Sequence, residues 1–249
     1  MIRIAVFGSE GRMGKLVREE SGDGFGVEAC YDVRSPGLSP DRSPPPEVQV
    51  VVDFSAADAW ADLDGLLKGT DVALVSGTTG LGDRQRELLD AWAVDRAVFW
   101  AANMSRGVYV LRRLLGMAAK MLDDADIELV ETHHKHKTDS PSGTAVRIAE
   151  DLGEVRPGLQ PVYGREGDCG ARRPHELGIH SLRGGDVPGD HSVGFFCRGE
   201  SVTLRHSVTS RRTFALGALR AAAFVAGRPP GRYGMQDLIT YLERNKNDT

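Results

Sequence analysis

The sequence predicts an α/β protein with an N-terminal Rossmann-type, doubly wound parallel sheet and a smaller α+β domain. Two observations lead to this prediction. Strand-like and helix-like segments alternate over residues 1–105, and strand-like segments follow one another over residues 178–210. The chain has 249 residues, of which 41% are hydrophobic and 27% are charged, so it can bury one or two hydrophobic cores.

The first elements form a strand, a glycine turn and a helix. Residues 1–7 alternate and are rich in branched side chains, glycines punctuate residues 8–14, and a helical segment follows at 15–20. The second strand, 26–31, ends at Asp32, where an acid accepts hydrogen bonds from an adenosine ribose. This arrangement favours a dinucleotide site over a plain βαβ turn whose glycines serve only tight packing.

The glycine turn departs from the usual fingerprint in one position. Its spacing is G-x-x-G-x-x-G, and Glu10 stands where G-x-G-x-x-G has its second glycine. Because a pyrophosphate repels a carboxylate, we expect the Glu10 side chain to point away while its backbone lines the turn. Arg12 could offset the charge.

Strands and helices continue to alternate along the first domain. Further strands are expected at 48–54, 71–75 and 97–101, with helices at 56–67 and 84–93 between them. The loops after these strands, at 53–55, 76–80 and 102–105, should surround the nicotinamide half of the cofactor, because ligands bind at the carboxyl ends of such strands. Ordinary turn chemistry also explains each loop taken singly. A proline-rich connector at 35–46 is expected to be an exposed loop without an assigned function.

A second domain is expected between residues 106 and 210. A helix at 108–122 leads into it, strands are expected at 179–182, 191–196 and 202–208, and the turns at 184–186 and 198–200 suit hairpins. A mixed or antiparallel sheet follows from this pattern. An alanine-rich helix at 213–227 would pack against a sheet and return the chain to the first domain, which then comprises 1–105 and 211–249.

The stretch 131–145 carries the most chemistry. His133 and His134 end a strand that begins near residue 127, so their side chains should point to opposite faces. Lys137 adds a cation, and His133 with Lys137 makes a general acid/base station. Ser142, Gly143 and Thr144 then open a helix, whose first amides and positive end would bind a carboxylate or phosphate.

Two other interpretations of this stretch remain open. His133, His134 and His136 could form a zinc site, but Lys135 and Lys137 would repel a metal and no cysteine lies nearby, so we expect no metal. A solvated basic loop ahead of an ordinary capped helix is the simpler alternative.

Composition excludes several classes of function. A net charge of −4 argues against general nucleic-acid binding, and no apolar run approaches the ~20 residues needed to cross a bilayer. Met1 leads straight into a strand, so no signal peptide is expected. Three scattered cysteines without C-x-x-C spacing indicate free thiols and a cytoplasmic location.

From end to end the chain resembles the 4-hydroxy-tetrahydrodipicolinate reductase (dihydrodipicolinate reductase) family of the diaminopimelate and lysine pathway. The family motifs G-x-x-G-R-M-G, G-T-T-G and A-N-F-S correspond to residues 8–14, 77–80 and 102–105, and E-x-H-H-x-x-K-x-D-A-P-S-G-T-A corresponds to 131–145. Further matches lie at 183–186, 189–191, 210–211 and 213–215. The departures from the family pattern are Glu10, Met104, Arg106 and Ser140.

The resemblance implies a hydride transfer from NADH or NADPH to a cyclic, unsaturated dicarboxylate, which yields tetrahydrodipicolinate with loss of water. It implies that His133 is the acid/base residue, that Lys137 donates the proton, and that His134 holds the substrate carboxylates together with Ser142, Gly143 and Thr144. It also implies hinged closure of the two domains and a homotetramer formed through the second domain. The residues expected to bind the cofactor are Gly8, Ser9, Glu10, Gly11, Arg12, Met13, Asp32, Gly77, Thr78, Thr79, Ala101, Ala102, Asn103 and Met104.

The choice of cofactor depends on the end of the second strand. Asp32 favours NADH because a carboxylate repels the 2′-phosphate of NADPH, whereas Arg34 and Arg12 could bind that phosphate. We therefore expect dual use with a preference for NADH. The alternative functions are another two-domain dehydrogenase, acting on aspartate or homoserine, and a non-catalytic NADH sensor.

Overall fold

The computed structural model describes residues 1–35 and 43–245 and divides into two compact units. Unit 1 comprises Met1–Arg106 with Arg211–Thr249, and unit 2 comprises Gly107–Ser210. Arg106 therefore groups with unit 1, one residue beyond the expected boundary. Most of the proline-rich connector expected at 35–46 lies outside the described residues.

Unit 1 is built on a six-stranded sheet in which every pairing is parallel, with the strand order β11-β5-β4-β3-β1-β2. The strands are β1 (Ile2–Phe7), β2 (Phe25–Tyr31), β3 (Val50–Asp53), β4 (Ala73–Ser76), β5 (Ala97–Trp100) and β11 (Gly231–Tyr233). The helices are α1 (Arg12–Glu20), α2 (Trp60–Leu67), α3 (Asp83–Trp92), α6 (Arg212–Val225) and α7 (Met235–Arg244), and short 3-10 turns occupy Gly22–Gly24 and Ala57–Ala59.

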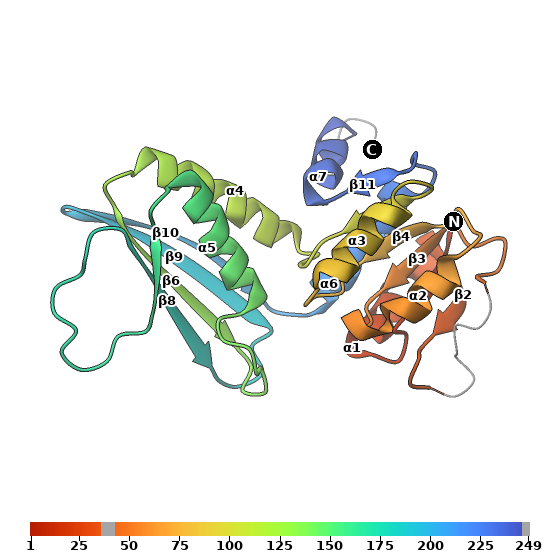
Figure 1. The fold of residues 1–249 in the computed structure, drawn as a ribbon, viewed down its shortest axis with the longest axis horizontal. Coiled ribbons are helices and arrows are strands. Elements are labelled where there is room, and N and C mark those ends of the chain that lie inside the picture. The colour runs from red at the N-terminus through yellow and green to blue at the C-terminus, as the bar shows by residue number, and fades with distance from the viewer. Residues whose placement is uncertain (36–42, 246–249) are drawn as a thin grey trace. The chain divides into compact units, whose positions relative to one another are not determined.

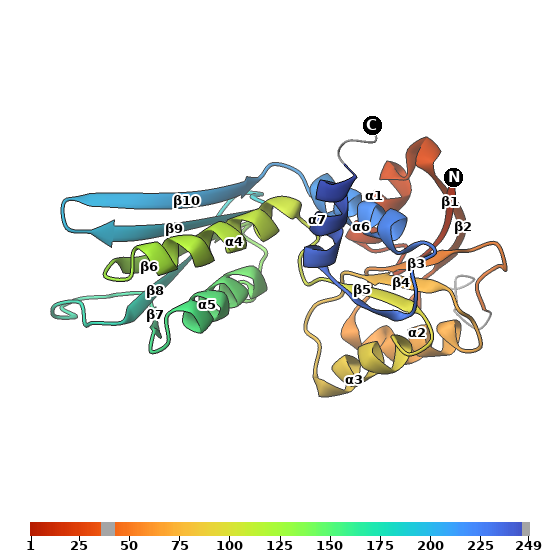
Figure 2. The ribbon, with the colours of Figure 1, turned by 90° about the horizontal axis from the view of Figure 1, so that it is seen from above.

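Both faces of this sheet are buried. Val50 and Val52 belong to a core shared with α1, α6 and α7, whereas Val51 belongs to a core shared with α2 and α3. These two groups of helices lie on opposite faces of the sheet (Figures 1 and 2). Because parallel strands covered on both sides must be apolar at every position, the uninterrupted valines of β3 suit this place in the sheet. The predicted doubly wound fold is confirmed.

Unit 2 contains a mixed five-stranded sheet with the order β10-β9-β6-β8-β7. Its elements are α4 (Arg106–Met121), β6 (Asp126–His133), α5 (Gly143–Val155), β7 (Gln160–Tyr163), β8 (Glu176–Arg183), β9 (Gly189–Cys197) and β10 (Glu200–Val208). Helices α4 and α5 cover one face, where Ile127 and Leu129 of β6 join their core (Figure 1). Among the described residues of unit 2, no helix covers the opposite face, to which Glu128 and Val130 point; we call it the open face.

One predicted connection in unit 2 is wrong. The turn at 184–186 does not close a hairpin, because β8 pairs in parallel with β6, and β9 pairs with the other edge of β6. The backbone of this turn instead pairs with the end of β6: Gly184 N donates to His133 O, and Lys135 N donates to Gly185 O. The hairpin predicted at 198–200 is present between β9 and β10. The sequence pattern did not indicate β7, β11 or α7.

We searched the described residues for membrane-spanning helices and for groups of metal ligands. No helix there combines the length and apolar character needed to cross a bilayer. No group of three or more His, Cys, Asp and Glu side chains is placed there to hold a metal ion.

The core of unit 2 yields a prediction about stability. Leu115 on α4 is 1% exposed and packs in the helix-covered core, so Leu115→Ala should lower the free energy of unfolding by about 2–5 kcal/mol. Met117 on the same helix is 59% exposed, and Met117→Ala should change the free energy of unfolding by less than about 0.5 kcal/mol. Urea unfolding followed by circular dichroism measures both. Equal losses in the two variants would contradict the packing described for α4.

Candidate active site

The glycine turn of unit 1 brings α1 close against the sheet. Gly8 has φ +78°, and a Cβ there would lie 2.8 Å from the backbone of Phe54 and Ser55. A Cβ on Gly14 would overlap the carbonyl of Gly8. Both positions therefore need glycine, and the close packing creates the anion-binding corner that a dinucleotide pyrophosphate uses.

Several amides of this turn are already used by the protein. Gly8 N and Ser9 N donate to Tyr31 O at 2.8 and 3.0 Å, and Glu10 N donates to Asp32 Oδ2 at 3.2 Å. The first turn of α1, which begins at Arg12, has amides without intrahelical acceptors. The amides of Arg12 and Met13 are consequently the ones best placed to bind a phosphate.

The side chain of Glu10 pairs with cations on α1. Its carboxylate lies 3.3 Å from Lys15 Nζ and 3.0 Å from Arg18 Nη1. These two side chains compensate its negative charge, so Arg12 is not required to do so.

Asp32 lies at the end of β2 and is 3% exposed. Its two oxygens accept hydrogen bonds from Glu10 N and from Arg34 N, the latter at 3.0 Å. It lines a hollow together with Gly8 and Ser55, where an adenosine ribose would be expected. The guanidinium of Arg34 is 4.0 Å away on a side chain that is 79% exposed.

The loop after β4 is held by a carboxylate that the sequence pattern did not single out. Asp53, at the end of β3, is fully buried and accepts hydrogen bonds from Ser76 Oγ at 2.6 Å and Thr78 Oγ1 at 2.8 Å. Trp60 Nε1 donates to the same oxygen at 3.2 Å, and Trp100 Nε1 donates to Thr78 O at 3.0 Å. The side chain and carbonyl of Thr78 are thus engaged within the protein, whereas Gly77 and Thr79 flank it at the surface.

The loop after β5 contributes mainly backbone. Met104 is 2% exposed and its side chain belongs to the core of unit 1, which explains why an apolar residue other than Phe is accepted there. Ala101 is also buried, Ala102 is exposed, and Asn103 Oδ1 accepts a hydrogen bond from Ser105 N at 2.9 Å.

In unit 2 the predicted acid/base residue, His133, is buried beside the carboxylate of Glu131. His133, the last residue of β6, is 8% exposed, and its Nδ1 lies 2.5 Å from Oε2 of Glu131, which is fully buried. The period of two along a strand places both side chains on the helix-covered face. Arg183 of β8 completes the group, with Nη1 3.0 Å from Glu131 Oε2 and Nη2 2.9 Å from Oε1.

The ionisation of this group follows from its surroundings. Burial alone would raise the pKa of Glu131, but hydrogen bonds from Arg183, Ser181 and His133 lower it below its usual value. Burial lowers the pKa of His133 more than Glu131 raises it, and the charge of Lys137 adds to the lowering. Near neutral pH, His133 is therefore neutral. Because the ionised Glu131 can only accept, Nδ1 carries the proton and Nε2 is bare.

The start of α5 is tied to the same group. Ser142 N donates to Glu131 Oε1 at 3.2 Å, and Ser142 Oγ accepts from Ala145 N and lies 3.2 Å from His191 Nε2. Burial lowers the pKa of His191 to about 4, so this ring is neutral near pH 7. Ser142 thus uses its amide and hydroxyl inside the protein, and the surface of the helix start is formed by Gly143 and Thr144.

Lys137 lies on the loop between β6 and α5. Its Nζ is 2.7 and 2.9 Å from the two oxygens of Asp139. Burial would raise the pKa of Asp139, but the hydrogen bonds and charge of Lys137 lower it below its usual value, so Asp139 is ionised. His134 N donates to Val187 O, which fixes the loop where it leaves the strand.

The structure brings His133, the Ser142 helix start and the loop of Lys137 together around Glu131. Sequence reasoning missed Glu131, Arg183 and His191 as site residues. A signal for Glu131 existed, because it stands two residues before His133 on one strand. His191 lies opposite Glu131 only through the pairing of β6 with β9, which the sequence does not state.

Comparison with known proteins identifies the family to which the chain belongs. Family models described as dihydrodipicolinate reductase, N-terminus and C-terminus, match residues 39–104 and 107–239. The chain is 42% identical to the 4-hydroxy-tetrahydrodipicolinate reductase of Wolinella succinogenes, across 96% of this chain and 99% of that protein. It is 41% identical to the reductase of the same name from Pseudomonas fluorescens, with the same two shares.

A solved structure gives the same result. The dipicolinate-bound dihydrodipicolinate reductase from Paenisporosarcina sp. TG-14 superimposes with a TM-score of 0.74 at 25% identity, covering 96% of this chain and 99% of that one. The chain therefore belongs to the dihydrodipicolinate reductase family of NAD(P)H-dependent oxidoreductases.

Proposed function

We propose that the chain reduces 4-hydroxy-tetrahydrodipicolinate to tetrahydrodipicolinate with NADH or NADPH, in lysine and diaminopimelate biosynthesis. The substrate gains one hydride and one proton and loses one water. The observation that carries the proposal is the buried Glu131–His133 pair beside the loop of Lys137, at the positive end of α5. The Lys137 ammonium and the His133 imidazole, next to first-turn amides, suit a dianionic substrate that must take up a proton.

Unit 1 has the features that a dinucleotide requires. Gly8 and Gly14 make the cradle, the amides of Arg12 and Met13 would bind the phosphates, and Asp32 would accept hydrogen bonds from the ribose. When bound, the reduced nicotinamide supplies the hydride. The Asp53 carboxylate holds the Gly77–Thr79 loop in a fixed position for that end of the cofactor.

The proton comes from unit 2. Hydride addition to a conjugated imine places electron density on the ring, and that density must be protonated. Lys137 carries a proton on Nζ, and Asp139 orients this ammonium through two hydrogen bonds. His133 offers the bare Nε2 described above as the acid/base group.

The substrate carboxylates are held at the start of α5. Gly143 is exposed, and a Cβ there would meet no atom within 4 Å, so an anion can approach the helix end closely. Thr144 and His134 flank this position in our assignment, while Ser142 supports it from below. The Paenisporosarcina enzyme binds dipicolinate, a dicarboxylate of the same kind.

Loss of either proton-transfer residue should abolish turnover without abolishing cofactor binding. We expect kcat to fall about 100-fold or more in His133→Gln and in Lys137→Ala. Nicotinamide absorbance, followed with substrate generated in place from pyruvate and aspartate semialdehyde by the preceding synthase, measures this.

The exposed neighbour His136 is the matched control, and His136→Gln should retain activity. NADH binding by fluorescence should persist in all three variants. A wild-type protein that binds NADH but does not oxidise it would instead favour the sensor.

We propose a preference for NADH over NADPH. The buried Asp32 faces the position of the ribose, whereas Arg34 is mostly exposed and 4.0 Å from it. A 2′-phosphate would meet the carboxylate before it could reach the guanidinium.

Asp32→Ala should raise the KM for NADH about tenfold, because the variant loses one hydrogen bond between the ribose and a charged group. The KM for NADPH should stay or fall. Arg34→Ala is the reciprocal control and should raise only the KM for NADPH. Asp32 also holds the glycine turn, because it accepts a hydrogen bond from Glu10 N. A rise of both KM values in Asp32→Ala would therefore show that Asp32 supports the turn and does not select between the cofactors.

We also propose that the protein forms a homotetramer, which assembles through the open face. We place it in the cytoplasm, because reducing conditions there suit the free thiols of Cys30, Cys169 and Cys197. Leu182 and Phe196 on this face are 53% and 48% exposed. Two glycines make the face flat: a Cβ on Gly178 would overlap the Glu128 carboxylate, and one on Gly194 would lie 2.8 Å from the Phe196 ring. Side chains that lie along the sheet suit contact with a second sheet.

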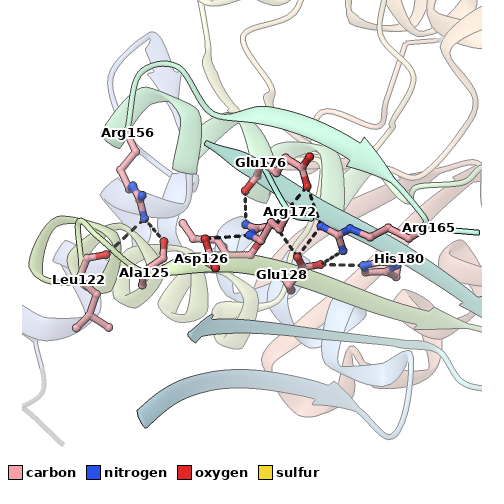
Figure 3. A network of polar contacts seen from close by, with 10 residues as sticks. Leu122, Ala125, Asp126, Glu128, Arg156, Arg165, Arg172, Glu176 and His180 are labelled. Carbon is pink, nitrogen blue, oxygen red and sulfur yellow. Dashed lines mark hydrogen bonds and ion pairs between the residues drawn. The ribbon is translucent and has the colours of Figure 1, made fainter. Parts of the chain in front are cut away.

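A network of ion pairs fixes part of this face. Glu128 binds Arg165 at 2.9 Å, Arg172 at 2.9 Å and His180 at 2.9 Å, and Arg165 also binds Glu176 at 3.1 Å (Figure 3). The two arginines come from the segment between β7 and β8, so the network holds that segment against the sheet. Its charges are paired internally, which lowers the cost of covering them with another subunit.

A single introduced charge can test whether subunits associate through the open face. Wild-type protein should have a mass of about four chains of 26.9 kDa by light scattering, and Phe196→Asp should reduce it, because a desolvated unpaired carboxylate is costly at a dry interface. Met117→Asp, on the exposed side of α4, is the control and should keep the wild-type mass. A tetramer that survives Phe196→Asp would place the interface elsewhere.

A further inference from the structure

We propose that Glu131 and Arg183 are a positioning pair that holds His133 as the Nδ1-protonated tautomer and links it to the loop of Lys137. The inference rests on the proposed function, because it assigns how the acid/base group of that reaction is set. Neither residue need touch the substrate for this role.

The carboxylate of Glu131 is a shared acceptor. It is fully buried and accepts from His133 Nδ1, from Ser142 N and from both terminal nitrogens of Arg183. These donors belong to β6, the start of α5 and β8. One carboxylate therefore orients the imidazole and fixes the helix end where a substrate carboxylate would bind.

The guanidinium of Arg183 reaches a second part of the site. Besides Glu131, its Nη2 donates to Asp139 O at 2.6 Å. The side chain of Asp139 binds Lys137 Nζ, so a single arginine connects the supports of both proton-transfer residues. Loss of Arg183 should disturb His133 and Lys137 together.

The other side of the His133 ring is packed. A Cβ on Gly189 would lie 2.9 Å from His133 Nε2, and the His191 ring lies edge-on at 5.3 Å between centroids. A ring flip would put the carbon Cδ2 in the place of Nδ1 and leave Glu131 without this donor. Packing by Gly189 and the hydrogen bond to Glu131 therefore favour the same orientation.

The charges facing His133 predict opposite effects of the two partners. The pKa of His133 is lowered most by burial, is raised by Glu131, and is lowered by Lys137 and Arg183, while the neighbouring His191 stays neutral. Removing Glu131 should thus lower the pKa of His133, and removing Arg183 should raise it.

The experiment measures kcat against pH in Glu131→Gln and Arg183→Gln. Both variants should lose about 100-fold in kcat with the KM for NADH unchanged within about twofold. The acidic limb, where activity falls as His133 is protonated, should move to lower pH in Glu131→Gln and to higher pH in Arg183→Gln. Shifts in the same direction, or none, would overturn the proposal, since a purely structural role leaves the limb in place.

Glu128→Gln is the matched control. Glu128 lies on the same strand, is also paired with arginines and a histidine, and faces the open side of the sheet. We expect its kcat and its acidic limb to equal those of the wild type. A similar shift in Glu128→Gln would show that the profile reports general damage to β6.

A second measurement does not depend on turnover. In protein labelled with ¹⁵N-histidine, the signals lost in His133→Gln identify His133. We expect Nδ1 to be protonated and Nε2 bare in the wild type near pH 7, with this preference lost in Glu131→Gln. Protonation at Nε2 in the wild type would overturn the proposal even if the enzyme is an active reductase.

Discussion

The buried carboxylate of Glu131 is the constraint on which unit 2 depends. Moving a carboxylate out of water costs several kcal/mol unless charged partners and hydrogen bonds replace the lost solvation. Here the replacements come from Arg183 on β8, His133 on β6 and the amide of Ser142 at the start of α5. Satisfying one carboxylate therefore brings together the elements that form the site.

In unit 1 a buried carboxylate likewise holds the loop after β4. Asp53 is fully buried at the end of β3 and collects donors from Ser76 and Thr78 after β4 and from Trp60 on α2. In both units a buried acid at or near the carboxyl end of a strand holds an adjacent loop. Loops positioned in this way keep their shape before a ligand arrives, which reduces the entropy lost on binding.

Local patterns predicted most of the fold and part of the site. The alternation of strand-like and helix-like segments over residues 1–105 predicted the parallel sheet, and the glycines at 8–14 predicted a turn between the first strand and the first helix. The strands β7 and β11 were missed because three or four residues carry too little periodicity. The ten-residue helix α7 was also missed, although Leu238 and Leu242 lie at helical spacing in it. The 184–186 hairpin was wrong because turn residues specify a turn and leave the pairing partner open.

The sequence by itself determined the fold class and the glycine turn between the first strand and the first helix, and it singled out His133 and Lys137 as the candidate acid/base pair, because these depend on residue type and short spacing. Only the tertiary structure decided that Glu131, Arg183 and His191 surround His133, and that Ser142 is occupied by Glu131 and His191. Their side chains meet through the pairing of β6 with β8 and β9, which joins residues about fifty positions apart in the chain. Such register is set by burial of a whole sheet face, a property that no short stretch of sequence contains.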